Sequence, residues 1–443
     1  MVVTHNNNCG NTMKKIFFPF IFALSLQGQA LAFETQVEQL ANEVEAEVIK
    51  WRRHFHQYPE LSNREFNTAK TIAQYLESLG LEVQTGIAKT GVVGILDSGK
   101  PGPVVALRAD MDALPITETV DLPFASKVRS THNGVDVGVM HACGHDTHMA
   151  MLMGAAKVLT SMKDKLNGKV KFIFQPAEEG APAGEKGGAE VMVKEGVLKS
   201  PDVDVIFGLH ISSAQDVGTV RYKEGGIMAA VDPYKIVVKG KQAHGAYPWK
   251  SVDPIVTAAQ IIMGLQTIVS REVKLIDSAA VVSVGMIQGG NRSNIIPSEV
   301  EMVGTIRTLN PHIRKHIHQS VHNKASSIAK SMNATAEVTL PLDYSYPITY
   351  NEPSLMRKMM PVLEQTAGKE NTLLSKAVTG AEDFSFFQEQ VPGLYLFVGG
   401  KAKDMPVEQA PGHHTPEFKI DESGMKLGVK LLSNLTLNYM ANH

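Results

Sequence analysis

Cysteine is nearly absent from this sequence, which holds two in 443 residues, Cys9 and Cys143. Removal of an N-terminal segment that contains Cys9 would leave Cys143 as the single cysteine, and this would exclude an intramolecular disulfide. A single thiol in an oxidising compartment is a liability unless it is buried or bound to a metal ion. The residues around Cys143 therefore decide what this thiol does.

The sequence also lacks an excess of charge of either sign. Lys and Arg total 43, Asp and Glu total 45, and the net charge is −2. Without a basic excess or a dense basic run, we expect no nucleic-acid partner and no membrane-surface binding. A small-molecule or peptide substrate remains by default. At 443 residues and 43% hydrophobic composition, the chain is long enough for two domains.

No hydrophobic run is long enough to span a bilayer, which requires ~20 residues. The apolar run over residues 16–26 follows two lysines and precedes an A-x-A pattern at residues 30–32. This order predicts a secretory signal peptide that begins at Met13, with Met1 as the alternative start and a membrane anchor as the alternative interpretation. We expect leader and signal over residues 1–32, and export to the periplasm or the medium.

Strand and helix patterns alternate along most of the remaining chain. This alternation predicts an α/β domain with a mainly parallel sheet over residues 33–230 and 345–443. A capping-box pair, Ser62 and Glu65, predicts the start of one helix, which ends at Gly80. The predicted strands cover 92–96, 103–114, 169–180, 202–210 and 393–400, and further helices follow His148 and cover 353–367.

Between residues 231 and 344 the order of elements becomes β-α-β-β-α-β. That order is the ferredoxin-like arrangement, which closes a four-stranded antiparallel sheet with both helices on one face. We therefore expect an inserted α+β domain that acts as a lid or forms a homodimer.

Polar residues follow the predicted strands. Asp110 and Asp112 follow one strand, Glu178 and Glu179 the next, and His210 another. In open α/β sheets ligands bind outside the carboxyl ends of the strands, so these groups are expected to converge on one crevice. The stretch VMHACGHDTHMAM (139–151) and the pair His413-His414 contribute further candidates.

Thiolate, imidazole and carboxylate together suit Zn²⁺ or a similar first-row metal ion. Cys143 and His145 are two residues apart on a predicted loop and can face one ion. Such a pair often occurs by chance, but the strand-end carboxylates and histidines favour the metal interpretation. His141 and His148 are expected to support the site or the structure rather than to bind metal.

The side chains of adjacent glutamates after a strand point in different directions, so the two carboxylates can have different roles. One of Glu178 and Glu179 can bind metal while the other takes a proton from water. A solvated acidic turn is the alternative interpretation of this pair.

Nine segments of the chain resemble, in the same order, those of the M20 metallopeptidases. The resemblance is to the amidohydrolase branch, which contains hippurate hydrolases, auxin-conjugate hydrolases and N-acyl-amino-acid amidohydrolases. The segments span nearly all of the chain after residue 32, so their order is more specific than any one motif. They are WRRHFHQYPELSNREF, ALRADMDALPI, MHACGHDTHMAM, QPAEEG, GLH, QAHGAYPWKSVDP, NIIPSEVEMVGTIRT, GAEDFSFF and HHTPEF.

The resemblance implies a site for two divalent metal ions, Mn²⁺ or Zn²⁺ first, with Co²⁺ and Ni²⁺ open. Glu178 resembles the general base, and Asp112 resembles the carboxylate that orients a ligand or the region of the base. Many relatives carry a metal-binding His in an H-x-D in this segment, where this chain has Arg108-Ala109-Asp110-Met111-Asp112, and this departure leaves the identity and occupancy of the second metal open. The implied ligands are Cys143, His145, Glu179, His210 and His414, with His413 as the alternative to His414.

In the inserted segment, His244 resembles a lid histidine that stabilises the oxyanion when the domains close. Asn294 and Arg307 resemble residues that hold the free carboxylate of the substrate, and arginine suits bidentate carboxylate binding. An ordinary loop histidine and a solvated strand arginine are the alternatives.

The resemblance thus implies an exported metal-dependent amidohydrolase that releases a free amino acid and a carboxylic acid from an N-acyl amino acid. A carboxypeptidase or dipeptidase of the same family is the nearest alternative. A non-catalytic binding protein, and an enzyme that uses the Cys143 thiolate, are alternatives from other classes.

Overall fold

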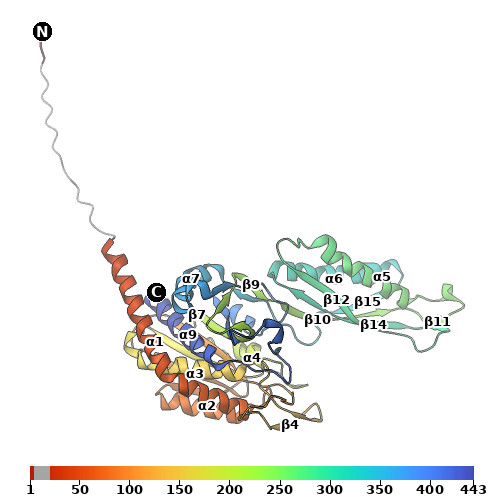
Figure 1. The fold of residues 1–443 in the computed structure, drawn as a ribbon. Coiled ribbons are helices and arrows are strands. Elements are labelled where there is room, and N and C mark those ends of the chain that lie inside the picture. Colours follow the sequence, from red (N-terminus) through yellow and green to blue (C-terminus); the bar gives the residue numbers. More distant parts are fainter. Residues whose placement is uncertain (4–19) are drawn as a thin grey trace.

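The computed structural model describes residues 1–3 and 20–443 (Figure 1). Residues 4–19, which include the start of the predicted signal peptide at Met13, lie outside this range, so export stays a prediction. Helix α1 (Phe20–Gln57) is the first element. In the part of the chain that the structure describes, no helix has the length and apolar character needed to cross a membrane.

An eight-stranded sheet forms the larger body, in the order β1-β2-β6-β3-β7-β18-β8-β17. Strands β6, β3, β7 and β18 run parallel at its centre, while β1 and β2 pair antiparallel at one edge. The predicted mainly parallel sheet is therefore found in the central strands. The strands are β1 (Glu82–Ile87), β2 (Gly91–Asp97), β3 (Val104–Asp110), β6 (Lys169–Gln175), β7 (Val205–Asp216), β8 (Val220–Tyr222), β17 (Thr372–Leu374) and β18 (Gly393–Lys401).

Helices cover both faces of this sheet, which explains why β3 is buried along its whole length. Val105 and Leu107 of β3 join the core under the large helices, while Val104 and Ala106 join the core on the opposite face. One face carries α1, α2 (Phe66–Ser78), α3 (His145–Ser161), α7 (Pro353–Ala367) and α9 (Met425–Ala441); the other carries α4 (Gly188–Lys194) and α8 (Ser385–Gln388).

The predicted capping box at the start of α2 is wrong. Helix α2 begins at Phe66, and neither Ser62 nor Glu65 caps it with its side chain. Ser62 donates instead to Asp112, and Glu65 accepts from the hydroxyl of Thr90 and the backbone N–H of Ala177. Both side chains thus connect segments that are distant in sequence. The buried carboxylates of Asp112 and Glu65 require hydrogen-bond donors, and the tertiary structure supplies them.

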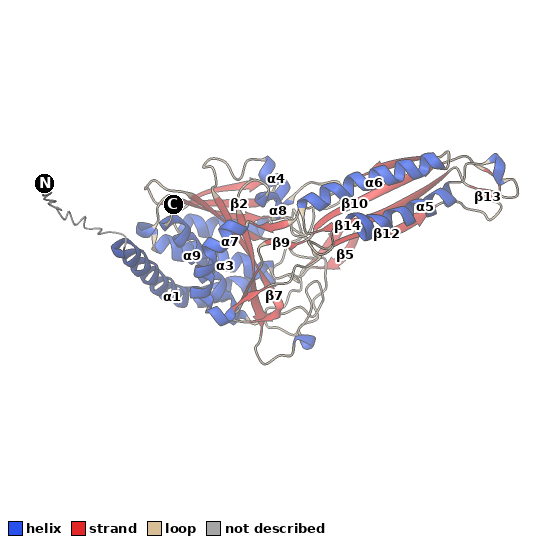
Figure 2. Cartoon of the chain, turned by 90° about the horizontal axis from the view of Figure 1, so that it is seen from above, coloured by secondary structure: helices blue, strands red, loops and turns tan. Residues whose placement is uncertain are grey.

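The second body is a four-stranded antiparallel sheet in the order β12-β14-β10-β15. Helices α5 and α6 share one apolar core with it, so both pack on the same face. Figures 1 and 2 show this unit projecting from the larger body. Its elements are β10 (Ala230–Lys239), α5 (Pro254–Thr267), β12 (Ala280–Gln288), β14 (Glu299–Thr308), α6 (Pro311–Ser331) and β15 (Thr335–Thr339). The predicted boundaries and the lid role stay predictions.

Short two-stranded ribbons complete the fold. Strands β9 (Gly225–Met228) and β16 (Thr349–Asn351) pair where the chain leaves for the projecting unit and returns from it. Strands β11 (Ala243–His244) and β13 (Ile295–Ile296) pair at the far end of that unit (Figures 1 and 2). Strands β4 (Arg129–His132) and β5 (Val135–Gly138) form a hairpin beside the larger body.

Candidate active site

A cavity of about 1180 Å³ opens at the carboxyl ends of the central strands. Strand β3 ends at Asp110 and β6 ends two residues before Ala177, as expected for an α/β sheet. His210 was predicted to end its strand, but β7 continues to Asp216. Pairing of β7 with β3 stops at Gly208, so His210 lies two residues past the last paired residue, and it lines the cavity. The predicted site residues in the cavity wall are Cys143, Glu178, Glu179, His210, Arg307 and His414.

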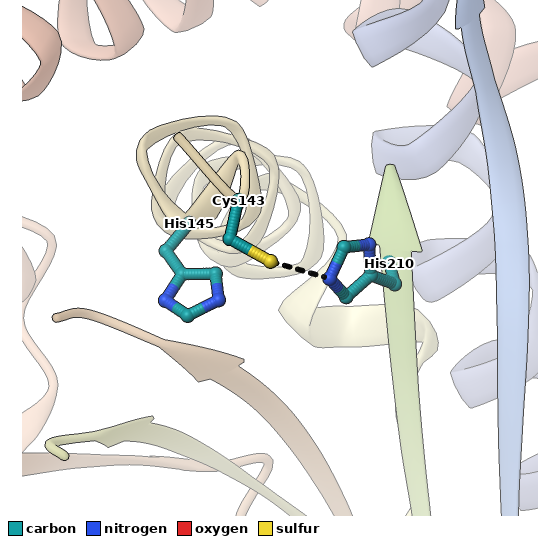
Figure 3. Close-up of side chains that lie close together, drawn as sticks. All are labelled: Cys143, His145 and His210. Atoms are coloured by element: carbon teal, nitrogen blue, oxygen red, sulfur yellow. Dashed lines mark hydrogen bonds between the residues drawn. The ribbon is translucent and has the colours of Figure 1, made fainter. Parts of the chain in front are cut away.

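The Cys143 thiol lies between two histidines that are distant in sequence. Its Sγ is 3.4 Å from Nε2 of His210 and 3.2 Å from Nε2 of His414. Figure 3 shows the thiol pointing from the turn before α3 toward His210, which comes from β7. His145 projects from the same turn as Cys143 (Figure 3).

His145 presents one ring nitrogen to the carboxylates of the cavity. Its Nδ1 lies 2.8 Å from the backbone oxygen of Asp112, which fixes the tautomer with the proton on Nδ1. The buried Nε2 has no hydrogen-bond partner among the described residues and lies 3.8 Å from Oε2 of Glu178 and 3.9 Å from Oε1 of Glu179. Burial acts to lower the pKa of His145, but the charges of Asp110 and Asp112 raise it to about 10, so the metal-free ring holds a proton on Nε2. A bound cation would take the place of that proton, which is how a buried histidine among carboxylates serves as a metal ligand.

Two groups of donor atoms meet through Glu179. Cys143, Glu179 and His414 form one group, and His145, Glu178 and Glu179 form another. Nε2 of His414 lies 3.0 Å from Oε1 of Glu179. Thiol, imidazole and carboxylate donors from four segments therefore converge in one pocket, and this donor set fits a first-row metal ion.

The structure separates the two adjacent histidines His413 and His414. Nε2 of His413 accepts the backbone N–H of Ser213 at 3.2 Å, and its Nδ1 lies 3.1 Å from the backbone oxygen of Cys143. Both ring nitrogens of His413 are thus occupied by backbone groups. Burial lowers the pKa of His413 to about 4, which keeps the ring neutral. Of these two histidines, only His414 presents a ring nitrogen to the Cys143 thiol.

His148 and His141 do not contribute free ring nitrogens to the same cluster. Nδ1 of His148 lies 2.6 Å from Oδ1 of Asp110, and its Nε2 accepts the backbone N–H of Ile211 at 2.9 Å. His148 therefore ties α3 to β3 and β7. His141 is buried without a hydrogen-bond partner among the described residues, and burial lowers its pKa to about 3.

Glu178 is buried beside other carboxylates. Burial, followed by the charges of Glu382 and Glu179, raises the pKa of Glu178 well above its ordinary value. The hydroxyl of Tyr346 donates to the backbone oxygen of Glu178 at 3.2 Å. A carboxylate with raised proton affinity next to a cluster of metal-type donors is suited to general-base chemistry.

Burial and the charges of Glu179 and Glu178 raise the pKa of the Cys143 thiol well above its ordinary value. The thiolate, not the thiol, is the nucleophile and the metal ligand. Without a cation the thiol therefore stays protonated and unreactive, so its surroundings disfavour a thiol enzyme and favour coordination.

The sequence reasoning missed a buried arginine network that forms one wall of the site. Nη1 of Arg108 donates to Asp110 at 2.8 Å, and Nη2 donates to Glu382 at 2.9 Å and to Asp383 at 3.1 Å. The acidic pair in GAEDFSFF and an arginine inside a buried strand were the available signals. Neither indicates its partner, because Arg108 and Glu382 are 274 residues apart.

The three residues predicted in the inserted segment are not together. Arg307 lines the cavity, whereas His244 and Asn294 lie at the far end of the projecting unit and do not line it. There the backbone N–H of Gly245 donates to the oxygen of Asn294 at 2.8 Å, and that of Ala246 donates to Nδ1 of His244 at 3.0 Å. The roles of His244 and Asn294 stay predictions.

Comparison with known proteins places this geometry in a family. Residues 106–438 match the model of peptidase family M20/M25/M40. The chain is 42% identical to thermostable carboxypeptidase 1 of Saccharolobus solfataricus, over 88% of this chain and 96% of that protein. It is 38% identical to N-acetylcysteine deacetylase of Bacillus subtilis, over 88% and 96% of the two chains.

Among solved structures, Bacillus subtilis YXEP is described as a dinuclear metal-binding peptidase of the M20 family. It superposes with a TM-score of 0.74 at 35% identity, covering 91% of this chain and 100% of that one. The cluster of thiol, histidine and carboxylate donors therefore lies in a fold whose relatives hydrolyse amide bonds. The chain belongs to peptidase family M20, in its amidohydrolase branch, and is a hydrolase of amide bonds.

Proposed function

We propose that the protein is an exported metal-dependent amidohydrolase that cleaves N-acyl amino acids into a free amino acid and a carboxylic acid. The observation that carries this proposal is the position of Arg307. Its side chain lines the same cavity as Glu178 and the metal-type donors, and no partner in the described chain neutralises it. A free guanidinium beside an amide-hydrolysing centre suits the carboxylate of an amino-acid product.

Two divalent ions would be held by Cys143, His145, Glu179, His210 and His414, with Mn²⁺ or Zn²⁺ expected first and Co²⁺ or Ni²⁺ as alternatives. Such ions polarise an amide carbonyl and lower the pKa of bound water. The Cys143 thiol would bind as the thiolate, since a cation offsets the nearby carboxylate charges.

Glu178 takes the proton of the attacking water and passes it to the leaving amine. Asp112 positions this base, because its two oxygens accept the backbone N–H groups of Glu178 and Glu179, each at 3.0 Å. Arg307 holds the free carboxylate and so orients the scissile amide.

We propose that His244 stabilises the developing oxyanion and that Asn294 assists Arg307 in binding the carboxylate. For both roles the far end of the projecting unit must reach a cavity, by closure of the molecule or in a second copy of the chain. The two residues are already adjacent across the β11–β13 pair, so one movement would deliver both.

A carboxypeptidase is the second candidate, favoured by the relative of that name at 42% identity. Its bond is also an amide next to a free carboxylate, so Arg307 serves both candidates equally. What differs is the group on the acyl side, an organic acid in one and a peptide in the other.

The test is release of free amino acid from N-acetyl, N-benzoyl and indole-acyl amino acids and from dipeptides. The chain from Phe33 onward is assayed with Mn²⁺, with Zn²⁺ and with EDTA. Metal-dependent release from the acyl series supports the proposal, whereas preferential cleavage of peptides supports the second candidate. Release that survives EDTA would indicate a thiol enzyme, and tight binding without turnover would indicate a binding protein.

A further inference from the structure

A second arginine lies in the cavity wall at a position fixed by the sheet register. Phe397 of β18 pairs with His210 of β7 on one side and with Arg221 of β8 on the other. Directly paired residues on neighbouring strands point to the same face of a sheet. All three residues line the cavity, and the rings of His210 and Phe397 lie 6.1 Å apart.

The register also sets the distance scale. Neighbouring strands are about 4.8 Å apart, so the backbone of Arg221 lies roughly 10 Å from that of His210. His210 contacts the Cys143 thiol, so this span begins at the proposed metal cluster. This distance between the two strands corresponds to that between the scissile amide of a bound substrate and a substituent a few bonds away from the amide.

Arg221 is chemically free. In the described part of the chain its guanidinium has no hydrogen bond or ion pair. Arg64 and Arg108, by contrast, are paired with Glu185 and Glu382, two carboxylates that line the cavity. Because Arg221 has no internal partner and lines a substrate-sized cavity, the N–H donors of its guanidinium are free to bind an anion.

We propose that Arg221 forms an anion subsite and that preferred substrates carry a second carboxylate, in addition to the one assigned to Arg307. This inference rests on the proposed function. The second carboxylate belongs either to the side chain of the released amino acid or to the acyl group. Both sources offer the same chemistry to Arg221.

Two matched pairs of substrates distinguish the sources. N-acetylglutamate and N-acetylglutamine differ only in the charge of the side chain, while N-succinyl-leucine and N-succinamoyl-leucine differ only in the charge of the acyl end. We expect a higher kcat/KM for the acidic member of one pair. Arg221→Gln should lower that value by about 10- to 100-fold and change the neutral member little, as expected for a charged hydrogen bond.

Lys186→Gln is the matched control, because Lys186 also lines the cavity and loses the same charge. Equal effects of the two substitutions would indicate general electrostatics and overturn the subsite. Equal kcat/KM for acidic and neutral members in the unaltered enzyme would also overturn it.

Binding of the same four compounds is also measured by calorimetry on metal-loaded protein whose turnover is removed by Glu178→Gln, alone or combined with Arg221→Gln or Lys186→Gln. Weaker binding of one acidic compound to the Arg221→Gln variant, but not to the Lys186→Gln variant, supports the subsite even if no compound is hydrolysed. In that case the proposed function fails while this inference stands. Identical binding to all three proteins contradicts it.

Discussion

The backbone N–H of Glu178 donates a hydrogen bond to Oδ1 of Asp112 over 3.0 Å. Asp112 also accepts from the hydroxyl of Ser62 at 2.7 Å and from the N–H of Glu179. One carboxylate thus fixes the turn that carries both the proposed base and a proposed ligand.

Asp112→Asn should lower metal affinity about 10- to 100-fold and reduce kcat, because an amide has only one oxygen for these donors. Metal content after dialysis and kcat at saturating metal separate the two effects. Ser62→Ala removes only one donor and serves as the milder control. If Asp112→Asn behaved like Ser62→Ala, the positioning role would be wrong.

Glu178→Gln should reduce kcat by about 10²- to 10⁴-fold, since the amide cannot accept the proton. Metal stoichiometry should stay that of the unaltered protein, because Glu178 is not among the proposed ligands. Glu179→Gln is the contrasting variant and should lose metal as well as activity. Substantial turnover by Glu178→Gln would remove its assignment as base.

The two adjacent histidines should give opposite results. His414→Gln should lower metal stoichiometry, because His414, unlike His413, presents a ring nitrogen to the Cys143 thiol. His413→Gln should mainly lower stability, by about 1–3 kcal/mol, since backbone groups of Ser213 and Cys143 lose a partner. Metal analysis and denaturant unfolding of each variant check this, and a reversal would make His413 the ligand.

Asp232 should contribute acid-sensitive stability at the base of the projecting unit. Burial acts to raise its pKa, but two hydrogen bonds from Arg314 hold the pKa well below its ordinary value. A depressed pKa stabilises the fold above the unfolded value of about 3.9, and this stability is lost as the pH falls.

Asp232→Asn should therefore cost about 1–3 kcal/mol at pH 7, because the half-buried guanidinium of Arg314 loses its anionic hydrogen-bond partner. The deficit relative to the unaltered protein should shrink between pH 5 and pH 2, roughly the range in which the unfolded carboxyl takes up its proton. Urea unfolding of the two EDTA-treated proteins at several pH values measures this difference in the free energy of unfolding. Asp277→Asn, at an exposed ion pair, is the control, and a pH-independent deficit would contradict the mechanism.

The projecting unit is proposed to form a homodimer. Strand β12 is one of the two outer strands of its sheet, with Ile287 exposed on it and Met263 exposed on the neighbouring α5. An unpaired strand edge with exposed apolar side chains favours association with a second copy. Ile287→Lys should shift the protein to monomer in analytical ultracentrifugation, whereas Leu374→Lys, on the outer strand of the larger sheet, should not. A monomeric unaltered protein would refute the proposal.

Much of the fold follows from local pattern. The strands around Val105 and Phe172 are short apolar runs, and the βαββαβ order of the second body is readable from hydrophobic spacing. Local pattern gave a wrong prediction at Ser62 and Glu65. Their spacing matches a capping box, but Ser62 donates to the buried carboxylate of Asp112, and the buried carboxylate of Glu65 accepts from Thr90. Local pattern also predicted that a strand ends at His210, whereas β7 continues to Asp216. Nothing in the local sequence shows that pairing with β18 extends β7.

The sequence by itself determined the donor types of the site, because Cys143 and His145 share one turn and Glu178 and Glu179 share another. Only the tertiary structure decided which donors meet. The position of His414, rather than His413, beside the Cys143 thiol and the pairing of Arg108 with Glu382 depend on contacts across more than 250 residues. The position of Arg221 depends on strand register, and register is set by packing of the whole sheet rather than by the residues beside it.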